Sequence, residues 1–190
     1  MGFRINSGGF RVSSGVFKAT PTNLTYTVGQ AALGGTVAYI LQSGDSGYDA
    51  NVQHGLITST SDIGFYAWFN GTYTTTGAAG TGLGTGLSNT NLIIASQGNG
   101  SYAAKVCRDF NGGGYTDWYL PSKDELNILR SNRATIGNFL PDSYGGGFNN
   151  YWSSTEATSN NAWYQIFSSG AQFSFNKFDN TISVRAIRNF

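Results

Sequence analysis

Charged residues are scarce in this sequence. Only 11% of the 190 residues carry a charge, against about 25% in an ordinary globular domain. The eleven basic and ten acidic residues leave a formal net charge of +1. Because this balance creates no long-range field toward nucleic acid or anionic lipid, we expect neither as a partner.

Cysteine and long apolar runs are also lacking. Cys107 is the only cysteine, which excludes an intrachain disulfide, and with His54 as the only histidine there are too few ligands for a zinc site. No stretch approaches the ~20 apolar residues of a membrane span. Residues 1–10 lack the apolar run of a signal peptide. The sequence predicts neither membrane insertion nor export by the usual signal.

Glycine and aromatic residues are abundant instead. There are 27 glycines, and 15% of the residues are aromatic. With so few charges, Ser, Thr, Asn, Gly and Tyr must form most of the surface, a mixture typical of paratopes. The alternative is an ordinary β-rich surface protein with many turns.

Residues 1–25 differ from the rest of the chain. Phe3–Gly8 is echoed by Phe10–Gly15, and each copy alternates apolar and polar residues before a Ser-Gly turn. We expect residues 1–25 to be a β-rich anchor or oligomerisation segment, with an added edge hairpin as the alternative. The remaining residues, 26–190, are expected to form one domain. A homo-oligomer is expected, and a trimer is favoured by analogy with fibres.

The pattern after residue 26 predicts strands, then helices, then strands, an α+β order. Ala103, Val106, Cys107 and Phe110 form one apolar stripe of a helix with Ser101 as its N-cap. A second helix starts at the capping box of Ser122 and Glu125, and residues 71–86 form a loop. The expected strands are 36–41, 55–58, 65–69, 151–154, 162–167, 171–175 and 182–187.

Several separated motifs carry a family resemblance. The main ones are Gly112–Leu126, Tyr151–Glu156, Ala162-Trp163 and Val184–Phe190, and weaker similarity extends it over residues 28–190. In this order and spacing they resemble the DUF1566 family, the domain type found at the C-terminus of the Legionella collagen-like adhesin. The resemblance implies a C-type-lectin-like fold with two helices and twisted antiparallel sheets. Such domains commonly serve as adhesins or tips of phage fibres.

The matched residues are expected to be mainly scaffold. Asp117 and Glu125 are predicted to pair with Arg185 and Arg188 as partly buried ion pairs. Burying each large side chain contributes a few kcal/mol, roughly. The scaffold set is Trp118, Leu120, Pro121, Glu125, Trp152, Trp163, Arg185 and Arg188.

The sequence offers no catalytic centre. Oxidase activity in this fold needs a pair of active cysteines, and only Cys107 is present; it is expected to be buried and inert. His54 is predicted to be structural, because no nucleophile-elbow motif accompanies it. Asp45, Asp49 and Asn51 are a weak calcium candidate, but they lack EF-hand spacing and are better interpreted as an Asx-rich turn. We therefore expect a non-enzymatic protein without a cofactor.

Binding is expected on two Asn-, Ser- and Tyr-rich segments that lie on one face. This stretch is hypothesised to be, or derive from, a diversified region, with an ordinary hydrophilic surface as the alternative. The candidate contact residues are Tyr144, Phe148, Asn149, Asn150, Glu156, Asn160, Asn161, Tyr164, Gln165, Gln172, Asn176 and Lys177.

The predicted function is receptor binding or adhesion. The favoured setting is the surface of a bacteriophage virion, in a fibre, spike or tail tip that recognises a host-surface glycan or protein. Residues 1–25 would then contact other virion proteins. The alternatives are a bacterial surface protein with a variable ligand site and a purely structural virion decoration protein.

Overall fold

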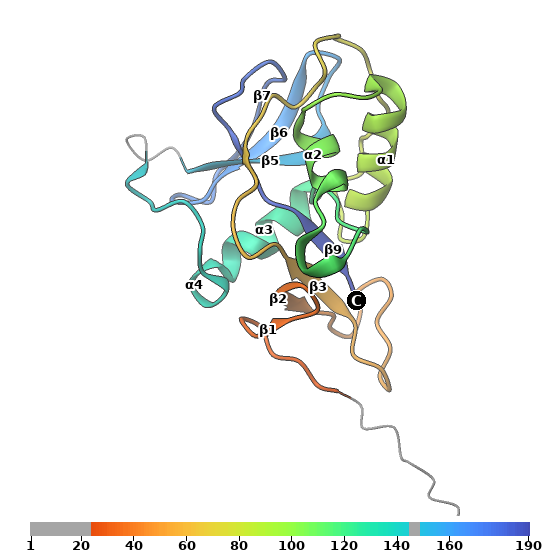
Figure 1. Cartoon of the computed structure of the whole chain (residues 1–190), viewed down its shortest axis with the longest axis vertical. Helices are drawn as coiled ribbons and strands as arrows, with labels where there is room; N and C mark the ends of the chain where they lie inside the picture. The colour runs from red at the N-terminus through yellow and green to blue at the C-terminus, as the bar shows by residue number, and fades with distance from the viewer. Residues whose placement is uncertain (1–23, 145–148) are drawn as a thin grey trace, which may run out of the picture.

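A computed structural model describes residues 24–144 and 149–190, which form two sheets and four α-helices (Figure 1). Residues 1–23, with the two predicted N-terminal strands, lie outside the described residues. Sheet A has the strand order β1-β2-β3-β9 and sheet B the order β4-β8-β5-β6-β7. This arrangement confirms the mixed α+β class.

The element bounds are as follows. The strands are β1 (Ala31–Ala32), β2 (Gly35–Ile40), β3 (Gly55–Thr58), β4 (Gly64–Phe65), β5 (Asn150–Glu156), β6 (Asn161–Ile166), β7 (Gln172–Asn176), β8 (Ser183–Val184) and β9 (Ile187–Asn189). The helices are α1 (Gly86–Gln97), α2 (Ala103–Asp109), α3 (Lys123–Ser131) and α4 (Arg133–Ile136), with a 3-10 turn at Gly112–Gly114.

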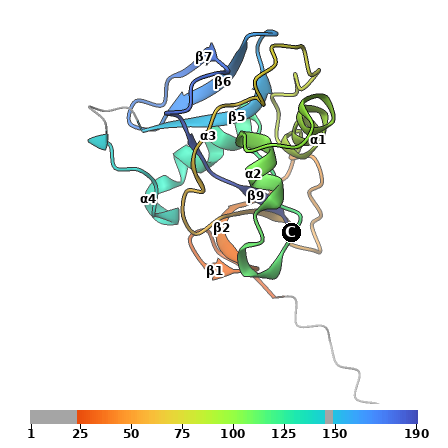
Figure 2. The ribbon, with the colours of Figure 1, turned by 45° about the horizontal axis from the view of Figure 1, so that its top comes forward.

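The two sheets lie at opposite ends of the molecule, and α3 lies between them, in contact with β2, β5 and β6 (Figures 1 and 2). Sheet A is antiparallel throughout, and its pairing of β3 with β9 joins the C-terminal strand to the N-terminal half of the chain. Sheet B contains one parallel pair, β5 with β8, so the expectation of purely antiparallel sheets is wrong there.

The predicted strand 182–187 is divided between the two sheets. β8 belongs to sheet B and β9 to sheet A, and Arg185 lies in the link between them. The fully buried Arg185 guanidinium donates to Asp62 at 2.9 Å and to the carbonyls of Gly137 and Asn138. These bonds fix the segment between β8 and β9. The apolar pattern of residues 182–187 continues through this segment, so it does not indicate the break in the strand.

The helices follow the sequence only in part. Ser122 and Glu125 form the predicted capping box of α3. The N-cap of α2 is Tyr102 instead of Ser101, and no side chain caps it. α1 was not predicted, because its buried face includes Asn89, Thr90 and Gln97 and so lacks an apolar stripe.

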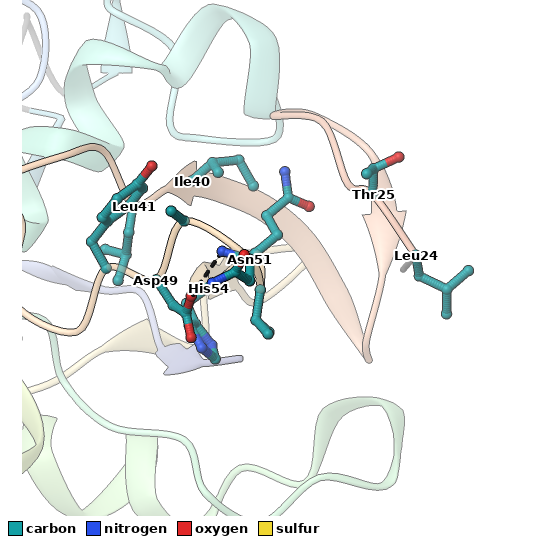
Figure 3. Close-up of a pocket in the computed structure, with 11 residues that line it drawn as sticks. Leu24, Thr25, Ile40, Leu41, Asp49, Asn51 and His54 are labelled. Atoms are coloured by element: carbon teal, nitrogen blue, oxygen red, sulfur yellow. Dashed lines mark hydrogen bonds between the residues drawn. The ribbon is translucent and has the colours of Figure 1, made fainter. Parts of the chain in front are cut away.

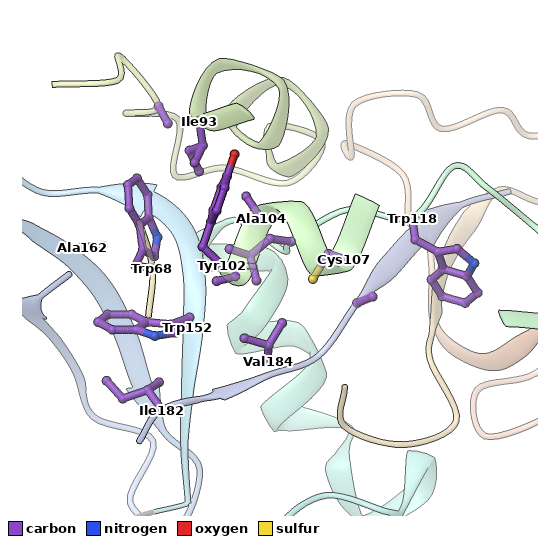
Figure 4. Close-up of a cluster of buried hydrophobic side chains, with 14 of the residues drawn as sticks. Trp68, Ile93, Tyr102, Ala104, Cys107, Trp118, Trp152, Ala162, Ile182 and Val184 are labelled. Carbon is purple, nitrogen blue, oxygen red and sulfur yellow. The ribbon is translucent and has the colours of Figure 1, made fainter. Parts of the chain in front are cut away.

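The largest core cluster is rich in aromatic rings. Trp68, Trp118, Trp152 and Tyr102 have no exposed surface, and Cys107 packs with them (Figure 4). Cys107 is fully buried as predicted, and burial raises the pKa of its thiol well above the usual value.

Trp163 corrects the predicted scaffold set. It is only partly buried, and the Lys123 ammonium lies 3.7 Å from the centre of its ring. Strand alternation explains this, because Trp163 points away from the core that holds its neighbours Ala162 and Trp152.

The predicted ion pairs are half right. Arg188 binds both carboxylate oxygens of Asp117, at 2.7 and 2.9 Å, and these bonds lower the pKa of Asp117. Glu125 pairs with no arginine in the described part of the chain: its carboxylate accepts the backbone N–H groups of Gly84 and Ser122, and Arg185 pairs with Asp62 instead.

Candidate functional site

The candidate site is built on β5, β6 and β7. Tyr164 on β6 lies directly opposite Phe173 on β7, and Trp152 on β5 lies opposite Tyr164 from the other side. Alternation places these rings on one face of sheet B, together with Phe175. The opposite face packs toward α3, where Gln172 donates to the Lys123 carbonyl and Gln165 to Asn127.

The aromatic face is open at its outer edge. Phe173 is 50% exposed and Phe175 47%. The Tyr164 ring lies 6.2 Å from both Phe173 and Phe175, and it is almost perpendicular to Phe175, at 71°. Trp152 supports Tyr164 from inside with an edge contact of 6.1 Å. Rings held in this way offer rigid apolar contact area to a ligand.

A hollow of about 420 Å³ opens on this face. Its volume is within the range of about 300–1,000 Å³ that is common for ligand sites. The pocket is lined by Tyr144, Asn150, Tyr164, Phe175, Asp179, Thr181 and Ile182. We call this site the aromatic pocket.

The pocket carries one charged group, the Asp179 carboxylate, and no cationic side chain among the described residues that line it. Asp179 is held in place because its Oδ1 atom accepts the backbone N–H and the hydroxyl of Thr181, at 2.7 and 2.6 Å. Burial raises the pKa of Tyr164, and the nearby Asp179 charge raises it further. The polar groups therefore consist of one carboxylate, several hydroxyls and the Asn150 amide.

Three of the predicted contact residues come together here: Tyr144, Asn150 and Tyr164 all line the pocket. Phe148 lies outside the described residues. The Tyr144 ring also stacks on Phe65, with centroids 5.7 Å apart and planes 13° from parallel.

Four predicted contact residues are buried, which corrects their assignment. Lys177 and Glu156 form an ion pair with side-chain exposures of 0% and 5%. Asn149 is fully buried; its side-chain amide accepts the Ser168 N–H and donates to the Leu140 carbonyl. Gln165 is also fully buried, and its side chain donates to Asn127. These polar side chains satisfy backbone and side-chain groups inside the fold, so they are not contact points.

The remaining candidates lie around β6 and β7 without lining the pocket. Asn160 lies in the β5–β6 turn and Asn161 begins β6, and both N–H groups donate to the Thr158 hydroxyl. Asn176 pairs opposite Asn161, and its side chain accepts the Tyr73 hydroxyl at 2.6 Å. Gln172 is held against α3.

The sequence reasoning missed Phe173, Phe175 and Thr181. The signal was available, because Phe173 and Phe175 alternate with Gln172, Ser174 and Asn176 along one strand. The prediction chose Gln172 and Asn176 on this strand, and their side chains lie on the face of β7 opposite the pocket.

The weak calcium candidate lies elsewhere, beside a second hollow of about 510 Å³ lined by Asp49, Asn51 and His54 (Figure 3). The Asp49 carboxylate accepts the Asn51 N–H at 2.7 Å, which confirms an Asx turn. Among the described residues, no group of three or more His, Cys, Asp or Glu side chains is placed to hold a metal ion. His54 Nδ1 lies 3.2 Å from the Phe190 carbonyl.

No helix in residues 24–144 and 149–190 combines the length and apolar character that a membrane crossing requires.

Comparison with family models identifies a domain in this chain. Residues 68–188, more than half of the chain, match the family model described as the Lcl C-terminal domain. The matched range includes β5, β6 and β7 and every residue named above as lining the aromatic pocket. A search of curated proteins found no match. Strands β2 and β3 lie outside the matched range but pack into the same core through Val37 and Ile57.

Proposed function

The chain belongs to the Lcl C-terminal domain family, and from this premise we propose that it is a non-enzymatic recognition module that binds its ligand in the aromatic pocket. The observation that carries the proposal is the exposed aromatic face of β6 and β7 beside a 420 Å³ hollow. Rigid rings with a few convergent polar groups are the usual composition of a binding site, and a monomer seldom leaves such a patch open without use.

The ligand class follows from the pocket's charge. A sugar ring has an apolar face that packs on aromatic rings and hydroxyls that bond to groups such as Asp179, Asn150 and Thr181. An acidic ligand would meet the Asp179 carboxylate without a cation to offset the repulsion. A neutral glycan of a host surface is therefore the proposed ligand, and a protein receptor is the competing outcome.

Two further features are part of the proposal. The fold is C-type-lectin-like, a view supported by the pairing of β9 with β3 and by the helices between them in sequence. The setting is the surface of a bacteriophage virion, in a fibre, spike or tail tip. Immunogold electron microscopy of the native source tests the setting, because label on cells and none on virions would exclude it.

Binding of the full chain to neutral and acidic glycans and to whole cells tests the ligand site. Phe175→Ala and Tyr164→Ala are expected to weaken binding about 30-fold each, because buried aromatic anchors contribute about 2 kcal/mol or more. Asn160→Ala, which changes an exposed residue outside the pocket, should bind normally. Unchanged binding by both pocket variants would refute the site and favour a decoration protein.

Asp179→Asn tests the charge argument separately. The Asn side chain can still accept from Thr181, so the turn is retained while the negative charge is lost. We expect binding of a neutral glycan to be nearly unchanged and the discrimination against acidic glycans to decrease. Strong binding of acidic glycans by the original chain would contradict the proposed ligand class.

A further inference from the structure

β7 is the last strand of sheet B, and β6 is its only hydrogen-bonded neighbour among the described strands. Its sequence, Gln172-Phe-Ser-Phe-Asn176, has no charge and no proline, and Phe173 to Asn176 are exposed. Proteins commonly protect free edges with lysine, proline, bulges or covering loops. β7 carries none of the protective residues, so this edge is open to pairing with another strand.

The β6–β7 register shows which backbone groups point outward. Ile166 N–H donates to the Ala171 carbonyl directly opposite, and Lys177 N–H donates to the Asn160 carbonyl. Since hydrogen-bonded and non-bonded pairs alternate along an antiparallel ladder, residues 171, 173, 175 and 177 bond toward β6. The N–H and carbonyl groups of Gln172 and Ser174, and the N–H of Asn176, therefore face the free edge.

We propose that a second copy of this chain pairs with β7, antiparallel and edge to edge, about a twofold axis at Ser174. The strand is nearly palindromic, reading amide, Phe, Ser, Phe, amide in either direction. In this register Ser174 lies opposite Ser174, Phe173 opposite Phe175, and Gln172 opposite Asn176. Like side chains therefore meet, with aromatic pairs on one face and hydrogen-bonding pairs on the other.

The pairing extends the recognition surface. Phe175 lines the aromatic pocket, and Phe173 of the second copy would lie beside it at the rim. Both pockets would open on the same face of one continuous sheet, so two ligand units on one surface could be bound together. A single short edge buries little area, which fits a weak, concentration-dependent dimer whose binding gains from avidity.

The test uses opposite charges at the twofold axis. Because Ser174 would face itself, Ser174→Lys and Ser174→Asp should each weaken association at least about tenfold through repulsion. An equimolar mixture of the two variants should associate again, because Lys then faces Asp. Ser174→Thr, which keeps the edge hydrogen bonds and favours strand structure, is the matched control and should associate as the original chain does.

Sedimentation velocity of the full chain over a concentration series gives the readout. The proposal is overturned if the chain does not self-associate at up to about 1 mM, if both charged variants associate like the original chain, or if their mixture does not recover association. If residues 1–25 also cause self-association, pairing through β7 would be a further association step, and the same three comparisons are applied to that step.

Ser174→Cys gives a second readout. Opposed residues of a hydrogen-bonded pair lie about 5.5 Å apart at Cα, which suits a disulfide, so oxidation should yield a covalent dimer. Ser88→Cys, at an exposed position on α1, should not. Because Ser174 is on the face opposite the pocket, single-site glycan binding by these variants should be unchanged, so failure of the dimer does not count against the ligand site.

Discussion

Replacing Lys177 by methionine should reveal how strongly one buried ion pair stabilises the proposed binding surface. The Lys177 side chain is fully buried, and its ammonium donates to Glu156 and to the carbonyls of Thr74 and Ser159. It also lies 4.7 Å from the centre of the Trp68 ring. Methionine keeps most of the stem's packing but removes every one of these polar contacts.

The expected loss follows from what remains. Glu156 would keep the N–H groups of Thr76 and Gly77 as donors but lose its counter-charge, and two partly buried carbonyls would lose a donor. Breaking one partner of a buried pair costs about 3–5 kcal/mol. For a chain of this size that corresponds to a decrease of roughly 10 °C in Tm.

The control is the surface pair of Lys105 and Asp109, which are one helical turn apart on α2. Lys105→Met should cost no more than about 1 kcal/mol, because exposed pairs are screened by solvent. Urea unfolding of both variants gives the comparison. Equal, small losses for Lys177→Met and Lys105→Met would refute the reasoning, and loss of ligand binding at unchanged stability would restore Lys177 as a contact residue.

Three other predictions concern the scaffold. The pKa of Asp117 is lowered below its usual 3.8, so the stability that Asp117 contributes is present above pH 3.8 and is lost as the pH falls. In urea unfolding, Asp117→Asn should therefore be less stable than the original chain at pH 7, by well under about 1 kcal/mol, and the difference should vanish in acid. Gly55→Ala should lower the free energy of unfolding by about 1–3 kcal/mol, because the added Cβ would clash with a carbonyl oxygen of β2. Gly82→Ala is the control and should be nearly neutral, because no atom lies within 4 Å of its added Cβ. Equal losses of stability would contradict the packing argument. Cys107 should resist a thiol reagent until the chain is unfolded in urea, and rapid labelling of the native chain would show an open path to the core.

The sequence predicted correctly those elements whose determining residues are close together in the chain. The capping box that starts α3 is contained in four residues, Ser122 to Glu125, and it was found. The β6–β7 hairpin was found because its turn and alternating strands are adjacent in sequence. α1 was missed because Asn89 bonds to Gly80, so that a polar side chain fills a buried position.

The errors in the site have a related cause. Glu156 and Lys177 were predicted to be exposed because charged residues usually are, but each has its partner 21 residues away in sequence. Nothing local shows such a partner. Phe173 and Phe175 were visible as an alternating pair, yet a hydrophobic pair on a strand normally faces the core. Only the position of β7 at the edge of its sheet leaves them exposed.

The position of the ion pair explains how this surface can be both exposed and rigid. Lys177 directly follows β7; its N–H donates to the Asn160 carbonyl, and its own carbonyl accepts the Trp68 N–H. The strand is therefore fixed by its backbone and by one buried side chain, while its outward side chains take no part in the core. Substitutions at Phe173, Ser174 or Phe175 then change what the surface contacts at little cost in stability, which is the separation of frame and contact residues that a recognition module requires.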